Sequence, residues 1–281
     1  MTNVKVLGTM RARLGEGLIW SVRDNALIWV DILSGYIIRT DPYSGSEQRW
    51  SVGEPIGCIV EDPDSNHYLA ALKSGFAHVR LDPESNSATL SHLIDPEPDL
   101  PDNRFNDGAV DPDGNFWAGT MDDDEVHIRG RWWRRRRNGQ IASIGGLFHV
   151  ANGPAFSPDR RWVYLTDSAK RIIYRGRYDS EAGMTAPAPW RTFDESHGYP
   201  DGMCFDDNGL LWIAFWDGAC LRALDHDGAV VHQIGLPVMR PTKIAFTPDG
   251  RCFVTTAASI TCEYEPDQNQ ALDGRLIELS I

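Results

Sequence analysis

Short apolar runs of four to six residues recur along the whole chain, each separated from the next by turn residues. A common phrase opens each unit: a glycine, two or three apolar residues, and then an acidic or Pro-Asp-Gly-like turn. The phrase begins at Gly17, Gly57, Gly108, Gly153 and Gly202, and at Lys243 in its sixth copy. A second run rich in aromatic and β-branched residues follows each turn, as in 27–30, 116–118 and 211–214. Runs of this length and composition predict strands, and no helical period of ten or more residues is present.

Units of roughly 40–50 residues with short antiparallel strands are typical of propeller blades. We therefore predict an all-β, six-bladed β-propeller with four-stranded antiparallel blades, forming a single domain over 1–281. The last unit is one strand short after 275–279, and the segment Val4–Leu7 can supply that strand. The N- and C-terminal strands would then close the ring and remove an exposed sheet edge.

Composition and charge argue against some classes of binding partner. The net charge of −13 argues against nucleic acid, because duplex binding depends on neutralising phosphates. No apolar run reaches the ~20 residues of a membrane span, and the first residues lack the apolar region of a secretory signal. We expect a cytoplasmic protein with no membrane partner, either a monomer or a weak homo-oligomer. The five cysteines contain no C-x-x-C pair, which favours reduced, buried thiols.

Segment 129–137 is basic, although the protein as a whole is acidic, because it contains arginines around Trp132 and Trp133. Interleaved basic and aromatic residues can mark a nucleic-acid or anion surface. The favoured interpretation is a strand with a solvated basic face that ends in the turn Asn138-Gly139.

Equivalent positions in the six repeats also predict which side chains meet at the axis of the ring. The residues just before the opening phrases are Glu16, Ile56, Asp107, Asn152, Asp201 and Thr242. Asn-Gly and Asp-Gly pairs can be simple hairpin turns, but other Asp-Gly and Asn-Gly pairs already supply the turns. Crowded carboxylates repel one another, so they either stay protonated or bind a cation. Oxygen ligands favour a hard divalent ion, and no histidine occupies an axial position.

At these positions the sequence resembles the SMP-30/gluconolactonase family of regucalcin-like sugar lactonases. The resemblance rests on segments 14–17, 103–108, 119–121, 152–154 and 200–203. It implies a divalent cation held by Glu16, Asn152 and Asp201, with Ca²⁺ expected and Mn²⁺, Mg²⁺, Zn²⁺ or Fe²⁺ as alternatives. It also implies substrate contacts from Arg104, Asn106 and Asp124. The family usually has glutamate at the last position, so Asp122, Asp123 and Glu125 are alternatives to Asp124.

The expected function is therefore a metal-dependent hydrolase that opens a small sugar (aldono-) lactone to the aldonic acid by attack of a metal-polarised water. In this hypothesis Asp201 is both a ligand and the proton acceptor, and the cation stabilises the developing oxyanion. Two alternatives remain: a phosphotriesterase-type metal hydrolase on the same scaffold, and a non-catalytic calcium-binding regulatory propeller.

Overall fold

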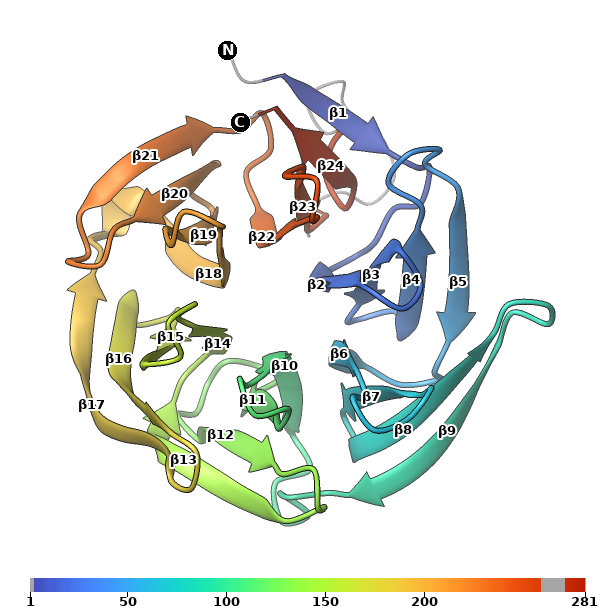
Figure 1. Ribbon diagram of the computed structural model, residues 1–281, viewed down its shortest axis with the longest axis horizontal. Helices are drawn as coiled ribbons and strands as arrows, with labels where there is room; N and C mark the ends of the chain where they lie inside the picture. The colour runs from blue at the N-terminus through green and yellow to red at the C-terminus, as the bar shows by residue number, and fades with distance from the viewer. Residues whose placement is uncertain (1–2, 259–270, 281) are drawn as a thin grey trace.

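The computed structural model describes residues 3–258 and 271–280, which form an all-β, propeller-like ring (Figure 1). Within these ranges the helical content is one short 3-10 turn, η1 (Glu195–His197). No helix there is long and apolar enough to cross a membrane.

Four separate four-stranded sheets make up most of the described part of the ring. The first contains β10 (Asn103–Val110), β11 (Phe116–Asp122), β12 (Gly130–Arg135) and β13 (Ile141–Phe148). The second contains β14 (Ala151–Phe156), β15 (Trp162–Asp167), β16 (Ile172–Asp179) and β17 (Gly183–Thr192). The third contains β18 (Tyr199–Phe205), β19 (Leu211–Trp216), β20 (Cys220–Leu224) and β21 (Val230–Gly235). The fourth contains β22 (Pro241–Phe246), β23 (Cys252–Thr256), β24 (Leu276–Leu279) and β1 (Val4–Leu7).

The remaining strands form one eight-stranded sheet, with the order β2-β3-β4-β5-β9-β8-β7-β6. Its first half is β2 (Gly15–Ser21), β3 (Ala26–Asp31), β4 (Tyr36–Thr40) and β5 (Glu47–Ser51). Its second half is β6 (Ile56–Glu61), β7 (Tyr68–Leu72), β8 (Gly75–Asp82) and β9 (Ser87–Ile94).

The prediction of six separate four-stranded blades is therefore wrong. In the described residues, hydrogen bonding produces four small sheets and one large sheet. The difference arises where the outer strands β5 and β9 pair in parallel at Ser51 and Ser87. An outer strand has a free edge that can pair with any neighbouring edge, and the repeat pattern contains no signal for such pairing.

The N- and C-terminal strands of the described residues pair with each other, as expected. β1 pairs antiparallel with β24, with Val4 opposite Leu279 and Leu7 opposite Leu276. The N-terminal strand thus forms the outer edge of a sheet whose other strands come from the C-terminal part of the chain (Figure 1).

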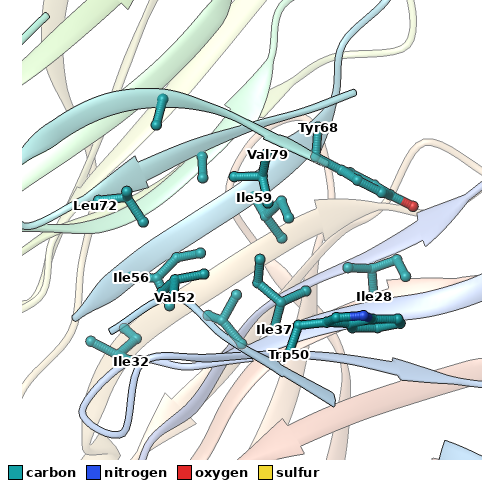
Figure 2. Close-up of a cluster of buried hydrophobic side chains, with 13 residues drawn as sticks. Ile28, Ile32, Ile37, Trp50, Val52, Ile56, Ile59, Tyr68, Leu72 and Val79 are labelled. Carbon is teal, nitrogen blue, oxygen red and sulfur yellow. The ribbon is translucent and has the colours of Figure 1, made fainter. Parts of the chain in front are cut away.

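The hydrophobic core lies between neighbouring sheet units. Figure 2 shows one cluster, in which Ile28 and Ile37 from β3 and β4 face Ile59 and Val79 from β6 and β8. Trp50 and Tyr68 belong to the same cluster. Burial of such side chains contributes about 25 cal/mol per Å² of apolar surface, so these contacts between units stabilise the ring.

The cysteines that the structure describes are free thiols, namely Cys58, Cys204, Cys220 and Cys252. Burial raises the pKa of Cys204 to about 12 and also raises the pKa of Cys58 and Cys252. These thiols are therefore neutral at physiological pH and act as small apolar side chains. Cys262 lies outside the described residues.

Candidate metal and substrate site

The innermost strands of the ring share one local irregularity. The register shifts between Glu16 and Ile19 in β2, between Asn152 and Ala155 in β14, and between Pro200 and Met203 in β18. A bulge bends a strand and changes the direction of a side chain, and bulges often occur beside functional sites. Here the irregularities fall at the opening phrases of the repeats, and the three strands that carry them lie innermost in the ring (Figure 1).

Glu16, Asn152 and Asp201 line one cavity of about 380 Å³. All three are buried, with exposed fractions of 4%, 3% and 5%. The structure therefore brings together residues that lie far apart in the sequence. Arg104 and Asn106 line the same cavity.

The two carboxyl groups of this set are held in an environment that disfavours their charges. Burial, followed by the negative charge of Asp107, raises the pKa of Glu16 to about 8. Burial, followed by the charge of Glu16, raises the pKa of Asp201 well above its ordinary value. A bound divalent cation would offset both effects, because it favours the ionised forms. Two carboxylates and one amide oxygen form a donor set that suits a hard cation.

The described residues contain no group of three or more His, Cys, Asp and Glu side chains arranged to hold a metal ion. The candidate set has two carboxylates and one amide, that of Asn152. The Asn152 Nδ2 donates to Ser168 Oγ at 2.8 Å, and its Oδ1 accepts from Asn106 Nδ2 at 3.1 Å. An amide oxygen has two lone pairs, so one remains for a cation.

Asn106 connects this amide to the candidate substrate arginine. Arg104 Nη1 donates to Asn106 Oδ1 at 2.7 Å, and Arg104 Nε donates to Asp123 Oδ1 at 2.8 Å. Lys73 Nζ also contacts Asp123, at 3.2 Å. Ser168, at the other end of the chain of hydrogen bonds, donates to the carbonyl of Pro200 at 2.6 Å. A continuous hydrogen-bonded network thus runs from Asp123 to the residue that precedes Asp201.

The sequence profile of the SMP-30/Gluconolactonase/LRE-like region matches residues 14–258. The 6-deoxy-6-sulfogluconolactonase of Pseudomonas putida is 36% identical over 244 residues, covering 83% of this chain and 79% of that protein. The pentonolactonase XacC of Haloferax volcanii is 32% identical over 260 residues, covering 92% of this chain and 86% of that protein. The chain belongs to the SMP-30/gluconolactonase/LRE-like family.

The fold is also similar to that of a solved structure. Regucalcin from Agrobacterium tumefaciens, described as a calcium-binding protein, superposes with a TM-score of 0.89 at 25% identity. The superposition covers 100% of this chain and 94% of that one.

In this member of the family, the acidic loop after Met121 places its four carboxylates in different environments. Asp122 is buried and accepts from the backbone N–H groups of Val126 and His127 at 2.9 and 2.8 Å. Asp123 pairs with Arg104, as described above. Asp124 is exposed and lies outside the cavity lining, whereas Glu125 lines the cavity.

The basic segment forms the expected strand and turn, and several of its arginines form ion pairs within the protein. Its strand is β12, which is followed by a turn at Arg136–Gly139. Arg134 is buried and lies 2.8 Å from Asp111, while Arg137 pairs with Asp64. Arg136 and Glu181 form a further pair, at 3.1 Å. The expected solvated basic strand is therefore wrong for Arg134, because alternate residues of β12 face the core.

Sequence reasoning missed several residues of the cavity, among them Ser168, Tyr199 and Trp216. Tyr199 could have been found, because it precedes Asp201 by two positions on an extended strand and such residues face the same side. Ser168 and Trp216 come from neighbouring segments, and nothing in the repeat phrase points to them.

Proposed function

We propose that this protein is a sugar lactonase that hydrolyses an aldonolactone to its aldonic acid with the help of one divalent cation. The observation that carries the proposal is the shared cavity, which combines Glu16, Asn152 and Asp201 with Arg104 and Asn106. Its volume of about 380 Å³ falls in the range of small-ligand sites. Relatives named as lactonases for sulfogluconolactone and pentonolactone support this class of substrate.

Glu16, Asn152 and Asp201 would hold the cation, and Ca²⁺ suits their oxygen donors. When bound, such an ion polarises a carbonyl and lowers the pKa of a water molecule. The structure of regucalcin described as a calcium-binding protein supports Ca²⁺ as the first ion to test.

The side chains of the cavity have distinct tasks in this proposal. Asp201 accepts the proton of the attacking water, whose oxygen forms a bond to the lactone carbonyl carbon. The ring C–O bond then breaks, and the ring oxygen leaves as a hydroxyl group after taking up the proton that Asp201 accepted. The products together contain the atoms of the lactone and one water.

Arg104, Asn106 and Glu125 would bind the hydroxyl groups of the substrate. Arg104 is held by Asp123 and by the Asn106 carbonyl, so its orientation is fixed before the substrate arrives. Fixed donors lower the barrier because the orientation of the lactone is achieved on binding and not during the reaction. Glu125 takes the acidic position of the site in this proposal because it lines the cavity.

The test is an assay of several pentono- and hexonolactones with protein stripped of metal by a chelator, before and after addition of Ca²⁺, Mn²⁺, Mg²⁺, Zn²⁺ or Fe²⁺. We expect activity only with added metal. Glu16→Gln and Asp201→Asn should each lose about 100-fold or more in kcat/KM, since the cation contributes several kcal/mol. Asp207→Asn is the matched control, because Asp207 is exposed and lies outside the cavity.

Unchanged activity after complete metal removal would refute the metal-dependent reaction. Hydrolysis of an organophosphate in preference to every lactone would instead show a phosphotriesterase. Tight Ca²⁺ binding without turnover of either substrate would indicate a calcium-binding protein without catalysis.

A further inference from the structure

Two aromatic side chains line the cavity beside its carboxylates. Tyr199 and Trp216 lie directly opposite each other in the register of β18 and β19, at the end of the paired region. Side chains directly opposite on an antiparallel pair lie on the same face of the sheet, about 5 Å apart at their Cβ atoms. The two side chains therefore lie next to each other on one face of the sheet, and we call this pair the aromatic wall.

The cavity lining contains two sets of residues, which we call its inner and outer levels. Its inner level consists of polar side chains from four inner strands, namely Glu16, Asn106, Asn152 and Asp201. Its outer level consists of the cavity residues two positions earlier in each segment, namely Leu14, Arg104, Val150 and Tyr199. Residues two apart on an extended strand are separated by about 6.6 Å along it. Arg104 is the one charged residue of these four, and Glu125 and Asp217 also line the cavity.

Each ring of the aromatic wall is covered by a guanidinium group. Arg171 lies 4.1 Å from the ring centre of Tyr199, and Arg240 lies 4.8 Å from that of Trp216. Arg240 Nε also donates to Asp217 Oδ1 at 2.7 Å, which fixes the arginine in place. Neither arginine lines the cavity, so the arginines cover the rings from outside it. Cation–π contacts of this kind hold an aromatic ring in one orientation.

We propose that the aromatic wall binds the non-polar C–H face of the lactone ring, while Arg104, Asn106 and Glu125 bind its hydroxyl groups. This inference rests on the proposed function and specifies how the substrate lies in the site. A sugar lactone has a rim of hydroxyl groups and a face of C–H groups. A pocket with polar groups on one part of its lining and rigid aromatic rings on another matches both features. The wall therefore selects ring lactones that have an unobstructed C–H face.

The test compares Trp216→Ala and Tyr199→Ala with the conservative variants Trp216→Phe and Tyr199→Phe. Contact with the ring persists from the bound substrate to the transition state, so loss of the wall should raise KM and leave kcat nearly unchanged. We expect KM to rise by about 10-fold for each alanine variant, and the phenylalanine variants should recover most of the loss. Trp162→Ala is the matched control, because Arg175 covers Trp162 at 4.6 Å, yet Trp162 lies outside this cavity.

A second measurement does not depend on turnover. Calorimetry should show weaker binding of the aldonate product to Trp216→Ala than to wild type or Trp162→Ala, using the aldonate of the lactone that is hydrolysed fastest. If no lactone of the panel is hydrolysed, the same titrations are done with glucono-1,5-lactone.

The outcomes separate the two proposals. Wild-type turnover with unchanged KM and affinity in both alanine variants would overturn the aromatic wall and leave the lactonase proposal intact. Lactone binding that depends on Trp216 without turnover would support the wall and refute the lactonase. Neither turnover nor binding by the wild type would overturn both.

Discussion

Lys243 Nζ donates to both carboxylate oxygens of Asp107, at 2.6 and 2.7 Å, across the axis of the ring. The two side chains come from β22 and β10, and both are buried. Asp107 also accepts the backbone N–H groups of Gly108 and Gly153, at 2.8 and 2.9 Å. Gly202 provides the space, because a Cβ there would lie 2.5 Å from the Lys243 Cδ.

This ion pair predicts a large effect on stability. Lys243→Met leaves the Asp107 carboxylate buried without its cation, which should lower the free energy of unfolding by about 3–5 kcal/mol. The measurement is urea unfolding followed by circular dichroism. The double variant Lys243→Met with Asp107→Asn should recover part of the loss, because the uncompensated charge is gone.

Lys5→Met is the control for removing a lysine. Its partner Glu278 lies 3.7 Å away, and the Lys5 side chain is 63% exposed. An exposed pair contributes about 1 kcal/mol or less. An equal and small effect of both single variants would show that the backbone donors alone suffice to hold Asp107.

Lys243 also illustrates how far the sequence predicts the site. The repeat phase placed Glu16, Asn152 and Asp201 at the axis, because equivalent positions of the inner strands converge there. Asp107 has the same phase, but it pairs with Lys243 and does not line the cavity. The repeat shows that lysine replaces a glycine in the sixth copy, yet it contains no information on which carboxylate the long side chain reaches.

Other differences between the expectations from the sequence and the structure have equally local causes. The pairing of Ser51 with Ser87 merges two sheet units, and it depends on the path of two outer strands. The acidic loop places Glu125 rather than Asp124 in the cavity, and Glu125 has a positive φ of 57°. A left-handed residue of this kind reverses the chain locally, which sequence spacing alone does not reveal.

The acidic loop therefore gives a direct comparison of two neighbouring carboxylates. Glu125→Gln should lower kcat/KM for the preferred lactone by roughly 10- to 100-fold, because a hydrogen bond to a charged group contributes about 1.5–3 kcal/mol. Asp124→Asn should remain close to wild type, since Asp124 does not line the cavity. A larger loss in Asp124→Asn than in Glu125→Gln would assign the substrate contact to Asp124.

Ser168 should affect cation binding indirectly, through its hydrogen bond with Asn152. Its hydroxyl accepts from Asn152 Nδ2 and donates to the Pro200 carbonyl, so it orients one ligand and fixes the segment before another. Ser168→Ala should weaken Ca²⁺ binding by about 10- to 100-fold in calorimetry, as is usual for a residue that orients a ligand. Ser196→Ala, in the exposed turn η1, is the control. Unchanged affinity in Ser168→Ala would show that Asn152 is oriented by Asn106 alone.

The raised pKa of Glu16 predicts how stability depends on pH in the absence of a cation. Its pKa is about 8 in the folded protein, against an ordinary value of 4.5. The folded state therefore binds the proton more tightly, and unfolding releases it between these two pH values. The free energy of unfolding should fall as pH rises from about 4.5 to about 8, and the stabilisation by the neutral carboxyl is lost above that range.

Urea unfolding in a chelator at a series of pH values measures this dependence. Glu16→Gln should reduce the slope, and part of it should remain because the pKa of Asp201 is raised as well. Saturating Ca²⁺ binds the ionised carboxylates, so it should oppose the decline and stabilise the protein most at the alkaline end. Identical slopes in wild type and Glu16→Gln would mean that Glu16 is already ionised in the folded protein without a cation, and that its burial is offset by other charges.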